Sequence, residues 1–287
     1  MALILEGKSL ALKKEEDLKK KVENIKDKIS FLIIQIGKNE STEVYVRQKM
    51  KKSERLGFSP IYKNFDEDTK EEEIINFIKE EQKREDIYGL ICEQPIPKRY
   101  NSLKIIESID KEKDIDCLTP ANLGRLAWDE PVFYPATPKA VIDLLENYGL
   151  YPEGKRILII SRSIIIGKPL LLMLLRKGKM GDATVICAHS KTNELKELTK
   201  MADIIITAVG KPYFLTSDMV REDSIIIDCG INVIEKEGKT SIVGDASYEE
   251  LLDKVKAITP VPGGVGVLTT INILENVFLS YERKKGI

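Results

Sequence analysis

The sequence predicts an α/β fold with a parallel sheet, and three observations support this class. Short apolar runs rich in β-branched residues alternate with longer segments of helical periodicity, which is the pattern of repeated strand–helix units. The stretch 155–175 (KRILIISRSIIIGKPLLLMLL) joins one such run through a tight turn to an apolar helix. The chain has 287 residues, 43% hydrophobic and 32% charged, so it can bury the core of two domains or of one large domain.

Helices and strands alternate up to residue 116. The helical segments keep their apolar residues on one face, and the strand runs are short and apolar or alternating. After the last of these strands, Pro95 and Pro97 force an extended loop at its carboxyl end, where open α/β sheets bind their ligands. The patterns predict helices at Lys8–Lys26, Glu40–Leu56, Lys70–Arg84 and Asn101–Ile109, and strands at Phe31–Ile36, Ser59–Phe65 and Tyr88–Cys92.

A further helix and a second set of strands follow. Thr137 as N-cap and Pro138 at the first helical position open a helix that runs to Asn147 and is closed by Gly149. We interpret this helix as a connector between two domains. The same alternation then predicts strands at Arg156–Ile160, Ala183–Ala188, Ile204–Ala208, Ser224–Asp228 and Ala257–Thr259, and helices at Asn193–Met201 and from Leu268 to about Tyr281.

The turn Ser161–Gly167 is a candidate ligand site. A strand that turns into a helix presents backbone N–H groups and the positive helix end to an anion, as in sites for dinucleotide diphosphates. Only Gly167 of the usual G-x-G-x-x-G pattern is present. A strand–helix connection that binds no ligand is therefore the simpler interpretation of the turn taken alone.

The end of the next strand strengthens the case for a dinucleotide. In NAD sites this strand ends in an acid that holds the ribose hydroxyls, whereas a 2′-phosphate requires cations and hydroxyls. Here the strand ends in His189–Thr192 (HSKT), and Arg162 lies in the turn itself. Together these features suit a phosphate, as in NADP, and make a dinucleotide site as good an interpretation of the turn as a strand–helix connection without a ligand.

Composition and cysteine spacing argue against several other classes. Lys and Arg total 45 and Asp and Glu 46, which leaves a net charge of −1 and no global basic field for nucleic acid. The N-terminal run MALIL is too short for a signal peptide or a membrane span, so we expect a cytoplasmic protein with no membrane partner. Four widely spaced cysteines and a single histidine argue against a metal site.

Several separated motifs occur in an order that resembles one known family. The most specific is TPVPGGVG at Thr259–Gly266, whose glycines would let the backbone approach a flat ligand closely. The others are Tyr45–Lys49 (YVRQK), Asp114–Asp116 (DID), Asn122–Leu126 (NLGRL), Thr137-Pro138, Arg162–Pro169, His189–Thr192 and Asp228–Asn232 (DCGIN). The chain resembles, over nearly its whole length, the bifunctional methylenetetrahydrofolate dehydrogenase/methenyltetrahydrofolate cyclohydrolases.

This resemblance implies two domains with an active cleft between them. Residues 1–136 and 268–287 would form the α/β domain that binds folate and carries the catalytic groups. Residues 137–267 would form a Rossmann-like NADP-binding domain with a parallel sheet, in which 137–149 is the connecting helix. In similar enzymes two long helices join the domains, the assembly is usually a homodimer, and the substrates are one-carbon derivatives of tetrahydrofolate.

The resemblance also implies a role for each matching residue. A lysine and a tyrosine at the positions of Lys49 and Tyr45 flank the reacting carbon of the folate, and an aspartate like Asp116 holds the pterin. The implied catalytic set is Lys49, Tyr45 and Glu93; the substrate-binding set is Tyr45, Lys49, Cys92, Glu93, Gln94, Asp116, Pro262, Gly263, Gly264, Val265 and Gly266; and the cofactor-binding set is Ser161, Arg162, Ser163, Gly167, Ser190 and Ile231.

The implied reaction is the NADP-dependent oxidation of 5,10-methylenetetrahydrofolate to 5,10-methenyltetrahydrofolate. Its hydride transfer chiefly requires alignment, whereas hydrolysis of the product to 10-formyltetrahydrofolate needs proton transfer, for which Lys49 is suited. Ser161, Cys117 and Val267 replace two glycines and a proline of the family pattern, which bears on backbone geometry. Glu93 stands where the family has the glutamine partner of the catalytic lysine.

The change at Glu93 leads to a specific expectation about the second activity. A carboxylate beside Lys49 favours the cationic form of the lysine, so we expect a dehydrogenase whose cyclohydrolase is weak or absent. Two alternatives stay open, because Gln94 could take the glutamine's place and Lys49 could act as a cation. Another NADP-dependent oxidoreductase, or a non-catalytic dinucleotide-binding protein, would also fit the C-terminal half but would not require Tyr45, Lys49 and Asp116 together.

Overall fold

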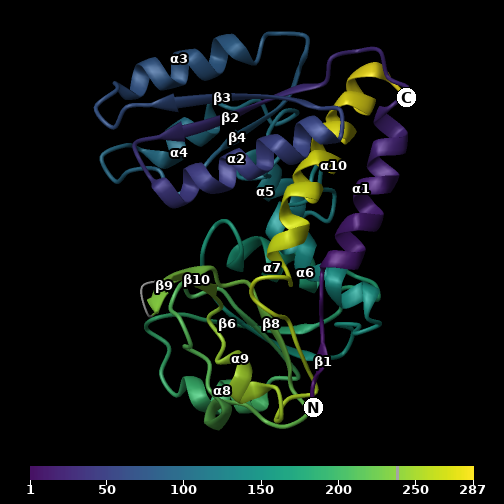
Figure 1. Ribbon diagram of the computed structural model, residues 1–287, viewed down its shortest axis with the longest axis vertical. Helices are drawn as coiled ribbons and strands as arrows, with labels where there is room; N and C mark the ends of the chain where they lie inside the picture. Colours follow the sequence, from purple (N-terminus) through teal and green to yellow (C-terminus); the bar gives the residue numbers. More distant parts are fainter. Residues whose placement is uncertain (237–238) are drawn as a thin grey trace. The chain divides into compact units, whose positions relative to one another are not determined.

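The computed structural model describes residues 1–236 and 239–287 (Figure 1). The chain forms two compact units. Unit 1 comprises Met1–Leu12 and Ala136–Thr269, and unit 2 comprises Lys13–Pro135 and Thr270–Ile287. Each unit has a parallel sheet of its own, which confirms the predicted α/β class.

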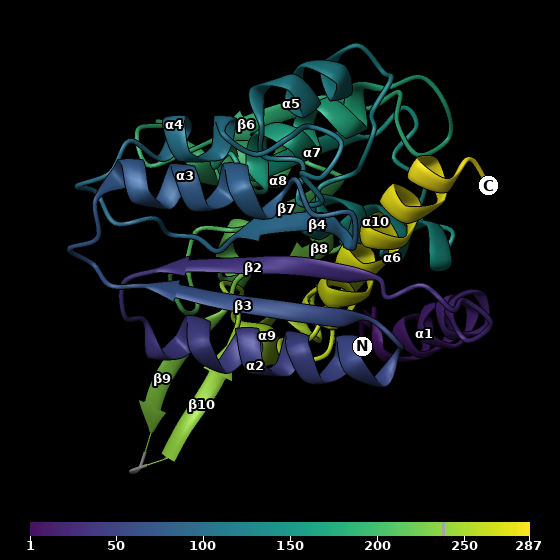
Figure 2. The same ribbon diagram turned by 90° about the horizontal axis from the view of Figure 1, so that it is seen from above.

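Unit 2 is built on a three-stranded parallel sheet in the order β3-β2-β4. β2 (Ser30–Ile36) and β4 (Ile87–Cys92) are buried at every residue, whereas β3 (Ser59–Phe65) is partly exposed. Helices α2 (Glu40–Arg55) and α3 (Glu71–Glu81) lie on opposite faces of this sheet (Figures 1 and 2). Cover on both faces explains why β2 and β4 have almost no polar residues.

Two short helices and parts of two long ones complete unit 2. α4 (Ser102–Glu107) and α5 (Pro120–Ala127) each follow a residue whose side chain accepts a backbone N–H of the first turn. α1 (Lys8–Val22) and α10 (Gly266–Lys285) are divided between the units, and their residues 13–22 and 270–285 belong to unit 2.

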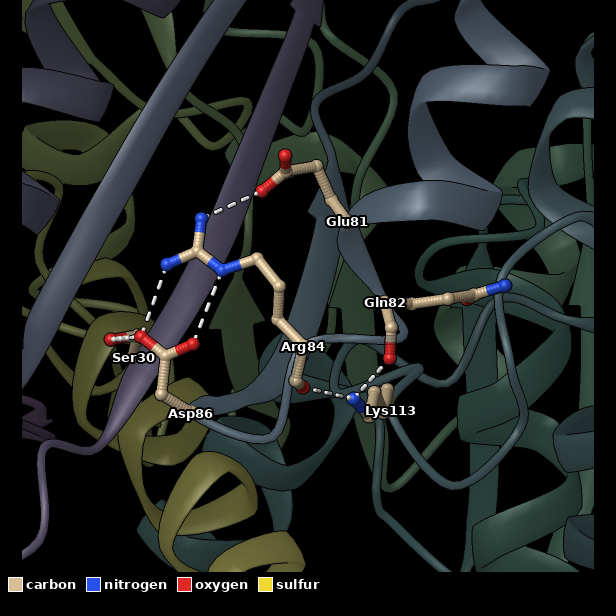
Figure 3. A network of polar contacts seen from close by, with 6 residues as sticks. All are labelled: Ser30, Glu81, Gln82, Arg84, Asp86 and Lys113. Carbon is tan, nitrogen blue, oxygen red and sulfur yellow. Dashed lines mark hydrogen bonds and ion pairs between the residues drawn. The ribbon is translucent and has the colours of Figure 1, made fainter.

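A polar network closes the amino end of the unit 2 sheet (Figure 3). The guanidinium group of Arg84 donates to both carboxylate oxygens of Asp86, at 3.1 Å each, and the hydroxyl of Ser30 on β2 donates to the same carboxylate at 3.1 Å. Lys113 donates to the carbonyl oxygens of Gln82 and Arg84, which satisfies acceptors left free at the end of α3. These contacts fix the entry into β4 beside β2.

Unit 1 is built on a six-stranded parallel sheet in the order β1-β11-β8-β7-β5-β6. From β5 the chain forms its neighbour β6 and then returns to the other side of β5 to form β7. The topological switch point, where open α/β sheets bind ligands, therefore lies between the carboxyl ends of β5 and β7. The strands are β1 (Leu3–Ile4), β5 (Arg156–Ile160), β6 (Thr184–Ala188), β7 (Ile204–Thr207), β8 (Ile225–Asp228) and β11 (Ala257–Ile258).

The other elements of unit 1 are helices and one hairpin. Its core includes Leu158, Ile205 and Ile226 from three neighbouring strands, all with no exposed surface. Within the described ranges, no helix is long and apolar enough to cross a lipid bilayer. The elements are α6 (Ala136–Asn147), α7 (Gly167–Leu175), α8 (Leu195–Met201), the 3₁₀ turn η1 (Ser217–Met219), α9 (Tyr248–Leu251) and the antiparallel pair β9 (Asn232–Lys236) and β10 (Lys239–Val243).

Several predicted boundaries need correction. The helix expected to start after a cap at Thr137 begins at Ala136, so Thr137 lies in its first turn. The helix expected over Lys8–Lys26 ends at Val22 and is followed by a turn. The strand predicted at Arg156–Ile160 has those bounds in the structure.

Within the described ranges, six elements were not predicted, and one of them affects the division of the chain. β1 pairs with β11 through Leu3 with Ala257 and Ile4 with Ile258, so residues 1–12 group with unit 1. The predicted division had placed residues 1–12 with the other domain. The remaining unpredicted elements are α5, η1, β9, β10 and α9.

Candidate active site

The first cluster of predicted site residues lies in unit 2, at the carboxyl end of β4. Lys49 on α2 forms an ion pair with Glu93, the residue that follows β4, and the two side chains are only 11% and 15% exposed. The backbone N–H of Glu93 donates to Ile34 on β2 at 2.8 Å, which fixes the loop behind the carboxylate. Tyr45, one turn before Lys49 on α2, is 39% exposed, and partial burial raises the pKa of its phenol. The structure thus brings together the two predicted catalytic residues that can carry charge at neutral pH.

Two polar residues near this pair, Tyr62 and Gln35, were not predicted from the sequence. Tyr62 on β3 donates to the side chain of Gln35 on β2 at 3.0 Å, and Gln35 donates to the carbonyl of Gly37 at 3.1 Å. Burial raises the pKa of Tyr62, and the negative charges of Glu43 and Glu93 raise it further. A buried glutamine in the otherwise apolar run of β2 is the signal that could have identified them.

The neighbours of Glu93 have different environments. Cys92 is buried, and burial together with the charge of Glu93 raises the pKa of its thiol to about 12, so it stays protonated at neutral pH. The side-chain amide of Gln94 donates to the carbonyl of Cys92 at 3.2 Å, next to a cis bond to Pro95. Gln94 is therefore directed at the strand end, and Glu93 occupies the place beside Lys49 that the alternative interpretation gave to Gln94.

The predicted pterin-binding residue Asp116 lies half-buried on a turn that is shaped by another aspartate. Asp114 is 1% exposed and accepts hydrogen bonds from the backbone of Leu118 at 3.1 Å and of Thr119 at 2.8 Å. The amide of Asn122 donates to the same carboxylate at 2.9 Å. Asp114 thus fixes the turn that presents Asp116.

Cys117 on this turn is one of the departures from the family pattern, and its backbone conformation is unusual for a residue with a side chain. Its φ is +57°, a left-handed conformation that glycine adopts freely and that costs other residues about 1–2 kcal/mol. Its backbone N–H donates to the carbonyl of Asp114 at 3.0 Å, so the turn is closed despite the side chain. The chain thus holds a cysteine in a backbone conformation that favours glycine, the residue that the resemblance implies at this position.

The second cluster lies in unit 1, in the turn between β5 and α7. A Cβ atom on Gly167 would lie 2.2 Å from the carbonyl oxygen of Ser161, so only glycine fits there. The hydroxyl of Ser163 accepts the backbone N–H groups of Ile166 at 3.1 Å and of Gly167 at 3.3 Å. Ser163 thus accepts two of the backbone N–H groups that the sequence predicted would bind an anionic ligand. Arg162 is exposed on the turn.

The end of β6 forms a compact turn without an acidic side chain. The backbone of His189 donates to the hydroxyl of Thr192 at 2.8 Å, and the N–H of Lys191 donates to Nδ1 of His189 at 3.2 Å. The N–H of Thr192 donates back to the carbonyl of His189 at 2.8 Å. Ser190 and Lys191 are exposed at the tip. A hydroxyl and an ammonium group in this position suit a phosphate better than ribose hydroxyls.

The glycine-rich loop Pro260–Gly266 also belongs to unit 1. Gly263 has φ +117° and its carbonyl accepts the N–H of Gly7 at 2.9 Å, while Val265 is buried. Ile231 is 46% exposed, and its Cδ1 lies 3.9 Å from the point where a Cβ of Gly266 would be. The structure thus places the predicted cofactor contact Ile231 next to one end of the predicted folate loop.

Two buried aspartates behind this region were not among the predicted site residues. Asp228, 3% exposed at the end of β8, accepts the backbone N–H groups of Gly230 at 2.8 Å, Asp245 at 3.1 Å and Ala246 at 2.8 Å. Burial is the main cause that raises the pKa of Asp228 to about 6, and the charge of Asp245 adds to it, against the opposing effect of these hydrogen bonds. Asp228 therefore titrates just below neutral pH in the folded protein.

This shift predicts that unit 1 loses stability as pH rises. Between about pH 4 and pH 6 folded Asp228 keeps a proton that an unfolded aspartate has released, so the folded state binds more protons and its free energy of unfolding falls with rising pH. Above about pH 7 the free energy of unfolding has fallen by the full amount that the pKa shift of Asp228 implies, on the order of 3 kcal/mol. Urea unfolding at about pH 5 and about pH 7.5 measures the part of this loss that falls between the two pH values, about 1.4 kcal/mol. Asp228→Asn should show a smaller loss between the two pH values, and an equal loss in both proteins would contradict the assignment.

No group of three or more His, Cys, Asp or Glu side chains that could hold a metal ion occurs in the part of the chain that the structure describes. The two clusters of predicted site residues consist of a lysine–carboxylate pair in unit 2 and a strand–turn–helix in unit 1.

Comparison with known proteins gives two family matches that together span most of the chain. Residues 5–116 match the catalytic domain of tetrahydrofolate dehydrogenase/cyclohydrolase, and residues 135–285 match the NAD(P)-binding domain of the same family. The bifunctional protein FolD of Thermodesulfovibrio yellowstonii is 40% identical over 289 residues, covering 100% of this chain and 99% of that protein.

Solved structures agree with these matches. The bifunctional methylenetetrahydrofolate dehydrogenase/cyclohydrolase FolD of Campylobacter jejuni is 37% identical with a TM-score of 0.91, covering 99% of this chain and 100% of that chain. The corresponding enzyme of Trypanosoma brucei, solved with NADP and an inhibitor, is 26% identical with a TM-score of 0.93, covering 100% and 99%.

Proposed function

The chain belongs to the tetrahydrofolate dehydrogenase/cyclohydrolase family, and we propose that it oxidises 5,10-methylenetetrahydrofolate to 5,10-methenyltetrahydrofolate with NADP as hydride acceptor. The observation that carries this proposal is the full-length similarity, with both family domains matched in order. The alternatives of an unrelated oxidoreductase or a non-catalytic dinucleotide-binding protein do not account for the catalytic-domain match or for the Lys49–Glu93 pair.

The dinucleotide fits the residues of unit 1. Gly167 lets the turn close tightly between β5 and α7, because a Cβ there would meet the backbone of Ser161, and such a strand–turn–helix suits a diphosphate. No acid at the end of β6 repels a 2′-phosphate. Bound NADP supplies the electrophilic ring that accepts the hydride. Arg162 and Ser190 would hold the 2′-phosphate, and the exposed Ile231 would pack against the cofactor.

The residues of unit 2 would orient the folate. Asp116 accepts hydrogen bonds from the amino and ring N–H groups of the pterin, because an ionised carboxylate is the natural acceptor for such donors. Tyr45 and Lys49, one turn apart on α2, would flank the carbon that loses the hydride. Since the hydride step needs alignment above all, a rigid helix is a suitable support for both side chains.

We propose further that the cyclohydrolase half is weak. Hydrolysis of the methenyl cation requires a water to lose a proton as it attacks, and neutral Lys49 would be the acceptor for that proton. The ion pair with Glu93 opposes this role, because Lys49 would have to give up the charge that balances a largely buried carboxylate.

The proposed activity can be tested by following NADPH formation with methylenetetrahydrofolate as substrate. The expected result is an increase in NADPH absorbance that requires both NADP and the folate. A purified, folded protein that binds NADP but does not reduce it in the presence of the folate would contradict the proposal, and a protein that binds neither would contradict the site assignment as well.

Arg162→Ala should weaken NADP binding selectively. Loss of a charge-assisted hydrogen bond to the 2′-phosphate costs roughly 1.5–3 kcal/mol, or about 10- to 100-fold in the dissociation constant. Calorimetric titration with NADP and with NAD measures the effect, and NAD affinity should hardly change. Lys155→Ala, an exposed cation that precedes the amino end of β5, is the control. Equal affinity of the unaltered protein for NAD and NADP would contradict the phosphate-site assignment.

We also propose that the protein is a cytoplasmic homodimer, which rests on the family resemblance. Sedimentation equilibrium of the purified chain tests the assembly, and a monomer at all concentrations would contradict it.

A further inference from the structure

Asp245 binds three consecutive backbone amides of one loop. Its carboxylate has no exposed surface, and one oxygen accepts the N–H groups of Val209 at 2.5 Å and Gly210 at 3.2 Å. The other oxygen accepts the N–H of Lys211 at 3.0 Å. Asn232, at the start of β9, donates its amide to that second oxygen at 2.9 Å. One side chain thus fixes residues 209–211 of the loop 208–211.

This loop follows β7 and therefore lies at the topological switch point. The N–H of Ala208 donates to the carbonyl of Ile160 at 3.3 Å, so the loop leaves the sheet directly beside the end of β5. The turn 161–167 begins at that same strand end. In an open α/β sheet the dinucleotide binds in the crevice between two such strand ends. The loop 208–211 is thus the counterpart of the turn 161–167 on the β7 side of the crevice.

A carboxylate is well suited to hold this backbone. Gly210 has φ +71°, and amides in such a curved segment cannot all pair with a neighbouring strand. Unpaired buried N–H groups would each cost about 1–3 kcal/mol, and an ionised acceptor makes the strongest bonds to them. Gly230 leaves room for this carboxylate, because a Cβ on residue 230 would lie 2.3 Å from an oxygen of Asp245.

We propose that Asp245 is a positioning residue for NADP, which it serves by setting the conformation of loop 208–211 at the cofactor crevice. The inference rests on the proposed function for the identity of the ligand. Asp245 is buried behind the loop and acts through its backbone. A merely structural role would lower stability without a selective effect on the dinucleotide.

Asp245→Asn is the test variant, because it keeps the shape but replaces one acceptor oxygen with a donor that cannot accept the amides. We expect the dissociation constant for NADP to rise roughly tenfold or more, and the amides of residues 209–211 to exchange hydrogen faster than in the unaltered protein. The KM for the folate should change little.

Asp203→Asn is the matched control. Asp203 is a unit 1 carboxylate just before β7, at the opposite end of the sheet, where it accepts the backbone N–H of Arg156 at 2.7 Å and pairs with Arg221. This variant should lose stability while its NADP affinity and the exchange at 209–211 stay unchanged. If Asp245→Asn does not fold, Asn232→Ala removes one partner of Asp245 and should show the same two effects at smaller size.

The outcomes separate this inference from the proposed function. Folded Asp245→Asn with unchanged NADP affinity and unchanged exchange at 209–211 overturns the inference. If the unaltered chain binds NADP but does not oxidise the folate, the proposed reaction fails while the two readouts still decide the role of Asp245. Faster exchange at 209–211 without any loss of NADP affinity would show a purely structural role and would also overturn it.

Discussion

Replacing Lys49 with alanine should lower the dehydrogenase turnover roughly 100-fold or more, while the affinity for NADP stays within about twofold. A side chain that orients the reacting carbon or moves a proton typically contributes 10²- to 10⁴-fold to the rate. The fold should survive, because alanine is the best helix former and α2 keeps its other contacts. NADP affinity should survive because Lys49 belongs to unit 2 and the dinucleotide turn to unit 1.

The design needs two controls. Lys51→Ala removes an exposed lysine from the same helix and should leave turnover unchanged. Since Lys49→Ala also leaves the Glu93 carboxylate without its partner, the double variant Lys49→Ala with Glu93→Gln separates the loss of the lysine from the cost of an unpaired buried charge. The single variant Lys49→Ala and the double variant should lose dehydrogenase turnover to a similar degree. Full turnover in Lys49→Ala would make Lys49 an ordinary lysine that merely pairs with Glu93.

The strands at the centre of both sheets could be predicted because local sequence determines them. Arg156–Ile160 is a short apolar run bounded by charge and a turn, and its periodicity alone assigns it. β1 could not be found this way, since Leu3 and Ile4 form a strand only by pairing with Ala257 and Ile258. Two residues carry no period, and their partners lie at the far end of the chain.

The candidate site also contains residues that local sequence identifies and residues that only the fold identifies. Motif residues such as Gly167 and Asp116 were recognisable from local patterns and from the family resemblance. Gln35 and Asp245 were not, because their roles consist of contacts with segments that only the fold brings near. Asp245 is 34 to 36 residues away from the three amides that it binds, and nothing in its own surroundings in the sequence marks it. Buried polar residues that organise ligand loops are the part that sequence reasoning misses most readily.

Replacing Glu93 with glutamine should raise the cyclohydrolase turnover roughly tenfold or more and change the dehydrogenase much less. In the unaltered chain the Lys49 ammonium and the Glu93 carboxylate neutralise each other in a site where both are largely buried. Removing the proton of Lys49 would leave that carboxylate unpaired, whereas a neutral glutamine carries no such cost. Each 1.36 kcal/mol of that cost corresponds to tenfold in rate if neutral lysine accepts the proton of the attacking water. Hydride transfer moves no proton through Lys49, so it should be far less sensitive.

Both half-reactions should be measured on one preparation of each protein, with Glu43→Gln as the control. Glu43 is another carboxylate whose charge reaches Tyr62, but its ion pair is with Arg47 at 4.0 Å, so its removal leaves the Lys49–Glu93 pair in place. The control should alter neither activity. Cyclohydrolase turnover equal to that of the dehydrogenase in the unaltered protein would show that Lys49 works as a cation, a role that Glu93 tolerates. A rise confined to Glu93→Gln would instead assign the proton transfer to neutral Lys49, because that substitution removes the charge beside Lys49 and leaves the shape of the side chain almost unchanged.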